Sequence, residues 1–250
     1  MKIGITERGD AGINFSWYDK LPTVDGAVII TKKMSDEFID KMLTAVKPVA
    51  LHCTCTGWGG TYLEPNVPDY KTQLDYLKKL LSKGFDVNRV IVRIDPIIPT
   101  TEGIERVCNV LNYIRNNDIP VRRIRFSIYD EYPHARQRLA AIGKTPFYPD
   151  NKFTAPANMM KAVADALIQF TDFTFESCAE PAFVNMVKSD NFIEKGCVNA
   201  DVIKTLGLEI TTPMLENMQN RHGCHCLSCK TELLTERKRC PNGCLYCYWK

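Results

Sequence analysis

Residues 90–117 read VIVRIDPIIPTTEGIERVCNVLNYIRNN, and this stretch decides the fold class. Its first eight residues form a short, mostly apolar run of the kind that builds a strand buried on both faces. From residue 101 onward, apolar side chains such as Ile104, Val107 and Leu111 recur at helical spacing. A buried strand followed by an amphipathic helix is the repeating unit of parallel α/β sheets.

The same alternation extends over most of the first 180 residues. It predicts an α/β fold with a parallel sheet, because parallel strands need crossover connections that are usually helical. Six strands are too few for a complete eight-fold barrel, so we expect an open or partial TIM-like barrel. The strands are expected at residues 2–6, 27–31, 49–56, 90–97, 123–129 and 173–178, and the helices at 35–47, 69–83, 101–117 and 156–170.

Polar side chains gather where these strands end. Sheets of this type bind their ligands at the carboxyl ends of the strands. We therefore expect a polar ligand to lie near the strand ends, which are residues 31–33, 56–60, 93–96, 127–130 and 176–180.

The strand–helix alternation fades after residue 180. We expect residues 1–180 to form the partial barrel and residues 181–250 to form a cysteine-rich extension packed on it as a single structural unit. The N-terminus lacks the apolar run of a signal peptide, and no apolar stretch approaches the length of a membrane span. A cytoplasmic location without membrane attachment is therefore expected.

Eleven cysteines are unusual for a reducing compartment, where disulfide frameworks are rare. Clustered cysteines there indicate metal ligands. Cys240, Cys244 and Cys247 form a C-x3-C-x2-C element near the C-terminus. Three thiolates can hold three irons of a 4Fe–4S cluster and leave the fourth iron open, whereas electron-transfer clusters use four cysteines. An open metal position is typical of reactive sites.

With Tyr246 before its third cysteine, this element resembles the C-x3-C-x-aromatic-C signature of the radical S-adenosylmethionine superfamily. In that superfamily the signature follows the first strand of a partial (β/α)6 barrel. Its position here resembles a family of uncharacterised proteins in which the barrel is circularly permuted. Further resemblance lies in Arg8–Asp10, residues 31–33, residues 63–68, Arg93–Pro96, Cys178–Glu180, Gly196–Cys197 and Cys224–Cys226, and the Arg-x-Asp-Pro element is distantly similar to spore photoproduct lyase.

The resemblance implies a fold, cofactors and an activity. The C-terminal tail would lie over the barrel mouth, and its three cysteines would ligate the cluster. The cluster would cleave S-adenosylmethionine reductively to a 5′-deoxyadenosyl radical, which would remove hydrogen from a substrate. Tyr246 would pack near the adenine. Five residues at the strand ends would contact the cofactor's carboxylate, amine or ribose, namely Thr31, Lys32, Arg93, Asp95 and Ser127. An electron donor such as flavodoxin or ferredoxin would be a partner.

A second metal is also implied. Four other cysteines match recurrent family positions and would close an auxiliary 4Fe–4S cluster, with a fifth as an alternative ligand; the four are Cys178, Cys197, Cys224 and Cys226, and the fifth is Cys229. His222 and His225 flank this group and are candidates to support its ligands.

A structural zinc site is the alternative. Cys226-x2-Cys229 and Cys244-x2-Cys247 are separated by 14 residues, which is close to zinc-ribbon spacing. The protein would then be a structural or nucleic-acid-binding module without radical chemistry.

Two features of the sequence bear on the substrate class. Residues 221–250 carry six Lys/Arg against two Glu within a chain of net charge +3. This basic segment and the lyase-like element make a nucleobase in DNA or RNA the first hypothesis, for modification or repair.

Overall fold

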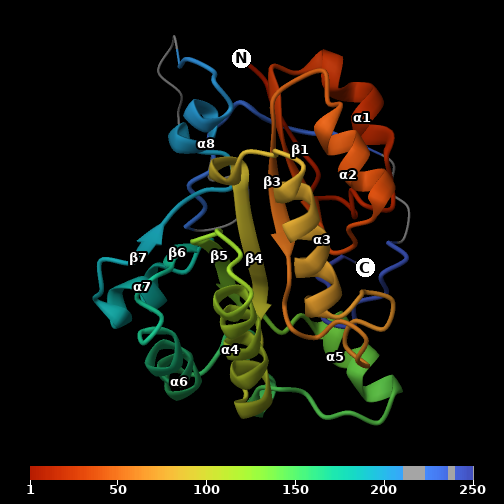
Figure 1. Ribbon diagram of the computed structural model, residues 1–250. Coiled ribbons are helices and arrows are strands. Elements are labelled where there is room, and N and C mark those ends of the chain that lie inside the picture. The colour runs from red at the N-terminus through yellow and green to blue at the C-terminus, as the bar shows by residue number, and fades with distance from the viewer. Residues whose placement is uncertain (211–222, 236–239, 250) are drawn as a thin grey trace.

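The computed structural model describes residues 1–210, 223–235 and 240–249. It confirms an α/β fold built on one eight-stranded sheet in which neighbouring strands are parallel. The strands are β1 (Ile3–Ile5), β2 (Gly26–Thr31), β3 (Val49–Thr54), β4 (Val90–Ile97), β5 (Arg123–Ile128), β6 (Thr174–Ser177), β7 (Phe192–Glu194) and β8 (Lys230–Glu232) (Figure 1).

The strand order is β7-β6-β5-β4-β3-β2-β1-β8. Within the described residues, β7 and β8 stand at the two ends of this order, so the sheet is open. All six predicted strands are present, but β7 and β8 were missed. Both lie where the alternation of the sequence fades, and their residues, Phe192–Glu194 and Lys230–Glu232, include charged side chains and form no apolar run, unlike the equally short β1.

The helices connect the strands as crossover segments. Their starts follow capping chemistry: Ser35, Asp69 and Thr100 each accept a backbone N–H of the first turn of the helix that follows. The helices are α1 (Ser16–Lys20), α2 (Asp36–Leu43), α3 (Tyr70–Ser82), α4 (Thr101–Asn116), α5 (Pro133–Ala141), α6 (Ala157–Leu167), α7 (Pro181–Val187) and α8 (Ala200–Thr205).

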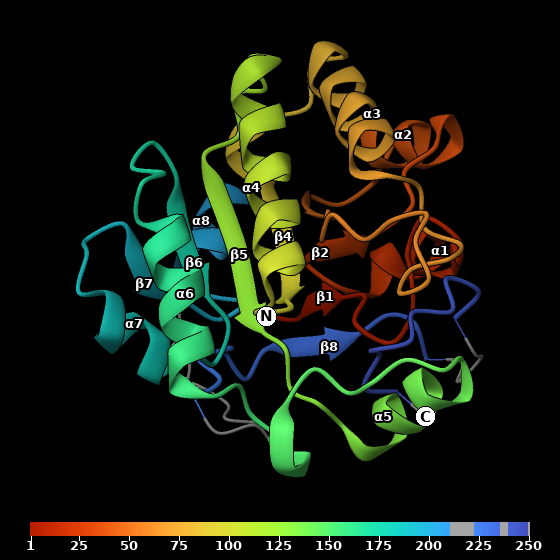
Figure 2. The same ribbon diagram turned by 90° about the horizontal axis from the view of Figure 1, so that it is seen from below.

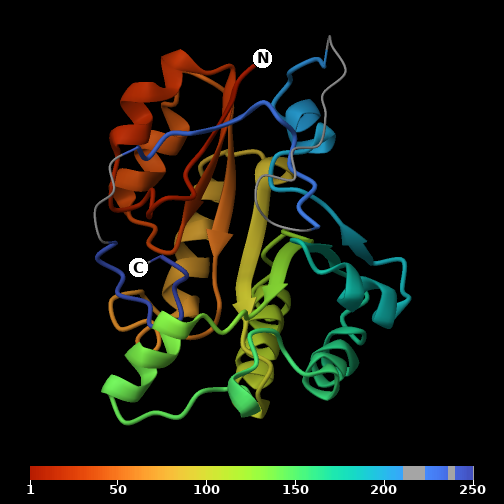
Figure 3. The same cartoon turned by 180° about the vertical axis from the view of Figure 1, so that it is seen from behind.

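Two apolar clusters cover the two faces of the sheet. The larger one joins the outer face to the helices that surround it, including α2, α3, α4 and α6 (Figure 2). The smaller one lies on the inner face, where Ile3, Val28 and Ala50 pack with Val202 and Leu206 from the α8 region. Figure 3 shows α8 near the amino ends of the strands and α5 near their carboxyl ends. The part of the inner face near the carboxyl ends of the strands therefore lies away from α8.

That inner face becomes polar toward β4, β5 and β6. Arg93 pairs in register with Arg125, and Arg125 with Glu176. Arg125 is fully buried and forms an ion pair with Glu176. Because side chains alternate along a strand, His52 shares the inner face with Ala50.

In the described part of the chain, no helix is both long and apolar enough to cross a membrane.

Candidate active site at the carboxyl ends of the strands

The C-terminal cysteine segment packs against the loops that follow the strands. The Leu245 N–H donates to the Leu63 carbonyl at 3.0 Å, and the Asn66 side chain donates to the Pro241 carbonyl at 2.8 Å. From α5, the Arg138 guanidinium donates to the Cys247 carbonyl at 2.7 Å. Residues 240–247 are thus tied both to the loop after β3 and to α5.

The three predicted cluster cysteines are brought together. Cys240, Cys244 and Cys247 are each partly buried and interact electrostatically with one another. Burial raises the pKa of the Cys244 thiol to about 12; the Lys32 ammonium opposes this shift, and the Glu64 carboxylate adds to it. Burial also raises the pKa of Cys240. The raised pKa values keep Cys240 and Cys244 protonated, so binding iron through their sulfurs would require the release of both protons.

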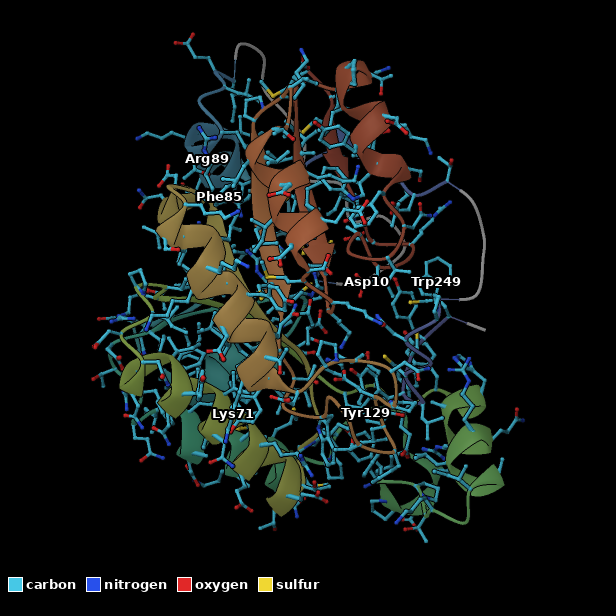
Figure 4. All side chains as sticks on the ribbon, turned by 45° about the vertical axis from the view of Figure 1, so that its right-hand side comes forward. Asp10, Lys71, Phe85, Arg89, Tyr129 and Trp249 are labelled. Carbon is cyan, nitrogen blue, oxygen red and sulfur yellow. The ribbon has the colours of Figure 1, made fainter. Side chains whose placement is uncertain are left out.

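Asp10 fixes the cysteine segment to the first two strands. Its carboxylate accepts the Thr31 hydroxyl at 2.6 Å, the Lys32 N–H at 2.9 Å and the Asn242 side-chain amide at 2.6 Å. The Gly12 N–H donates to it at 2.9 Å. A Cβ at Gly12 would lie 1.8 Å from the Lys33 carbonyl oxygen, so this turn requires glycine. Figure 4 shows Asp10 and Trp249 on one side of the molecule, away from Arg89.

Lys32, Glu64 and Tyr246 form a second link. The Lys32 ammonium lies 2.5 Å from a Glu64 carboxylate oxygen and 2.6 Å from the Tyr246 hydroxyl, which also donates to Glu64. Burial opposes the charge of Lys32, but the Glu64 carboxylate and Cys244 raise its pKa above the ordinary value. Burial, followed by Glu64, raises the pKa of Tyr246. A positive charge is therefore retained beside Cys244.

The other strand-end residues lie further along the sheet. Arg93 forms an ion pair with Asp95, and Ser127 donates to the same carboxylate. Arg93 also donates to the Cys197 sulfur at 3.6 Å. The five residues predicted from the strand ends thus fall into two sets, one around Thr31 and Lys32 and the other around Arg93, Asp95 and Ser127.

The predicted auxiliary cysteines also lie near one another. The Cys197 N–H donates to the Cys226 sulfur at 3.2 Å. The neighbouring Cys178 and Cys226 thiols hold the pKa of Cys197 well below its ordinary value, with burial opposing them, and Cys224 in turn acts on Cys226. The carbonyl of the fifth cysteine, Cys229, accepts the Ile3 N–H at 2.9 Å at the start of β1.

Of the two histidines that flank these cysteines, His225 lies 3.1 Å from a Glu194 carboxylate oxygen. His222 and the basic residues 237–239 lie outside the described residues.

The arrangement of the candidate ligand side chains determines which kinds of metal group they could hold. Within residues 1–210, 223–235 and 240–249, no three His, Cys, Asp or Glu side chains are arranged to hold one metal ion. Cys226, Cys229, Cys244 and Cys247 therefore do not meet as a ready zinc site. A cubane cluster makes a different demand, because each thiolate binds its own iron and the sulfurs need not converge on one point.

The three thiols at 240–247 fit a cluster in their chemistry and surroundings. The backbone of Asn242 acts to lower the pKa of Cys240, and the Lys32 ammonium acts to lower that of Cys244, although burial outweighs both effects. Both features favour thiolates, which are the form that binds iron.

Sequence reasoning named only part of this site. It did not list Asp10, Glu64 or Asn242 as site residues, although Asp10 and Glu64 lie in segments with family resemblance. In the sequence, both are carboxylates that follow a predicted strand. Carboxylates at such positions are also common in solvated loops, so the pattern alone did not mark them as site residues. Asn242 lies inside the cysteine element, where its role depends on the contact with Asp10, 232 positions away along the chain.

Among curated proteins, no sequence matches this chain. Of the solved structures, an HpcH/HpaI aldolase from Desulfitobacterium hafniense DCB-2 is similar at 9% identity over 82% of this chain and 89% of that chain, with a TM-score of 0.27. A likeness at that score carries no argument about activity. A family model described as "Domain of unknown function (DUF1848)" matches residues 17–249, and the chain therefore belongs to this family.

Proposed function

We propose that the protein is a radical S-adenosylmethionine enzyme whose cluster is held by Cys240, Cys244 and Cys247. The observation that carries the proposal is the contact between the cysteine segment and the carboxyl ends of the first strands. Asn242 bonds to Asp10, and Tyr246 bonds to Lys32 and Glu64. Residues from the two ends of the chain thereby form one polar site around three thiols.

The strand order supports a circularly permuted partial barrel. β8 pairs in parallel with β1, and the cysteine segment follows β8 in the sequence. In the superfamily that the motif resembles, the cysteines follow the first barrel strand. β8 would take that place, with β1 to β5 as the next five strands, and the cysteine tail would lie over the barrel mouth.

The cluster, when bound, supplies the electron that cleaves S-adenosylmethionine to methionine and a 5′-deoxyadenosyl radical. The protein's own residues hold and orient the reactants. Lys32 offsets the negative charge of the thiolates, while Glu64 and the buried Tyr246 hydroxyl fix its ammonium. Tyr246, Arg93, Asp95 and Ser127 are our candidates to contact the adenine, carboxylate, amine or ribose of the cofactor.

Three further parts of the proposal come from the sequence. The linked thiols from Cys178 to Cys224 are candidates for an auxiliary cluster. A flavodoxin or ferredoxin would deliver the electron in the reducing cytoplasm. A nucleobase in DNA or RNA is the first candidate substrate; it would have to be flipped out of a duplex to reach the strand ends.

The deciding experiment is anaerobic. Purified protein should be brown, contain iron and sulfide, and form 5′-deoxyadenosine when incubated with S-adenosylmethionine and dithionite. About four irons per chain would indicate one cluster, and about eight would add the auxiliary one. Colourless protein with stoichiometric zinc and no deoxyadenosine would overturn the proposal in favour of the zinc-bearing module.

A further inference from the structure

Asn242 lies inside the cysteine element and is almost fully buried, with 2% of its surface exposed. Its side-chain nitrogen donates to an Asp10 carboxylate oxygen at 2.6 Å. Asp10 also accepts from Gly12, Thr31 and Lys32, so its carboxylate is held by four donors. A carboxylate that serves as an acceptor must face the amide nitrogen of Asn242, which fixes the orientation of the amide.

The amide oxygen therefore points away from Asp10. In the described part of the molecule, Asn242 Oδ1 is inaccessible and has no hydrogen-bond partner. A buried acceptor without a donor is costly, so native structures usually satisfy such atoms with protein, water or a ligand. Asn242 lies two residues from both Cys240 and Cys244, so the unpaired oxygen belongs to a residue between two of the proposed cluster ligands.

We propose that Asn242 Oδ1 is a cofactor-binding acceptor that receives a hydrogen bond from the amino group of the S-adenosylmethionine bound beside Cys240. The inference rests on the function proposed above. The atom in question only accepts, so its partner must be a donor; in the methionine part of the cofactor, which would lie beside the cluster thiols, the amino group is the donor and the carboxylate offers none. Asp10 is a positioning residue in this arrangement, since it turns the amide oxygen toward the ligand and touches no cofactor itself.

The test compares Asn242→Ala with the wild type after anaerobic cluster reconstitution. Iron content is measured first, and then the Kd for S-adenosylmethionine by equilibrium dialysis. We expect unchanged iron and a Kd raised about tenfold, the effect of losing one hydrogen bond to a buried acceptor. The Kd for L-methionine, which carries the same amino group, should rise by a similar factor.

Asn66→Ala is the matched control. Asn66 is exposed and also bonds to the cysteine segment, through the Pro241 carbonyl, but its side chain does not lie inside the cysteine element. Its removal should leave both Kd values within twofold of the wild type. Asn242→Ser, which retains a small hydroxyl toward Asp10, is measured in parallel, so that a loss of iron in the alanine variant does not remove the comparison.

An unchanged Kd in an Asn242 variant that retains its iron would overturn the inference and assign the acceptor to a buried water. Equal weakening in the Asn66 control would also overturn it, because the effect would then come from the loop as a whole. A wild-type protein that takes up no cluster would refute the proposed function itself, and this is seen before any variant is compared.

Discussion

The ammonium of Lys32 lies 2.5 Å from the carboxylate of Glu64, and the Glu64 side chain is 2% exposed. Lys32 follows β2, and Glu64 lies in the loop after β3, so the pair joins two neighbouring strand ends. Tyr246 bonds to both partners and extends the link to the C-terminal segment. One charge pair thus connects the cysteine element to the sheet.

Glu64→Gln should destabilise the protein. The change leaves the Lys32 ammonium, whose side chain is 18% exposed, without its counter-charge. Breaking a fully buried pair costs about 3–5 kcal/mol, and the partial exposure of Lys32 reduces our expectation to about 2 kcal/mol. Urea unfolding at pH 7 measures the free energy of unfolding.

Asp36→Asn is the control for that change. It removes the partner of Lys79 in a pair of 2.6 Å whose side chains are both exposed, and it should alter stability little. Equal effects of the two substitutions would show that burial does not strengthen the Lys32–Glu64 pair.

Cys244→Ala should give folded protein without deoxyadenosine formation. The variant removes one of three proposed iron ligands, whereas the apolar contacts of the sheet stay in place. Iron content should fall, and circular dichroism should be unchanged. Cys108→Ala is the matched control, because Cys108 is a partly buried cysteine on α4 and should not affect iron content. Full retention of cofactor cleavage by Cys244→Ala would exclude the proposed site.

His52→Leu should change how stability depends on pH. His52 is fully buried, and in the described residues neither ring nitrogen has a partner. Burial lowers the pKa of His52 well below 6.5; the nearby Cys197 opposes this, and Arg125 adds to it. The folded state therefore holds His52 neutral, while the unfolded chain takes up a proton below pH 6.5.

The wild type should accordingly lose stability as the pH falls below 6.5, by up to about 1.4 kcal/mol per pH unit until the folded pKa is reached. His52→Leu should lack this part of the decline and be about as stable as the wild type at pH 7. Chemical unfolding between pH 7 and 5 measures both. Identical slopes for the wild type and His52→Leu would contradict the assignment.

Nucleic-acid binding, if the substrate hypothesis holds, should depend steeply on salt. Contacts between Lys or Arg and phosphates release counterions, so affinity for a single-stranded oligonucleotide should fall at least tenfold between 50 and 200 mM salt if about three or more phosphates are contacted. Fluorescence anisotropy of a labelled oligonucleotide measures this. Absent or salt-insensitive binding would count against a nucleobase in DNA or RNA.

The sequence by itself determined the α/β class, six of the eight strands and the cysteine element. These features are local: a buried strand shows in a run such as residues 90–97, a helix in its apolar spacing, and a ligand triad in the gaps between cysteines. β7 and β8 were not predicted because their short sequences, which include charged residues, form no apolar run.

Only the tertiary structure decided which polar groups share a site. Asn242 meets Asp10, and Tyr246 meets Glu64, because β8 pairs with β1 and brings the chain's end to the start of the sheet. Such contacts depend on strand order, which no local pattern encodes. The grouping of Arg93 with Asp95 and Ser127, and the contact of Cys197 with Cys226, follow from register and burial for the same reason.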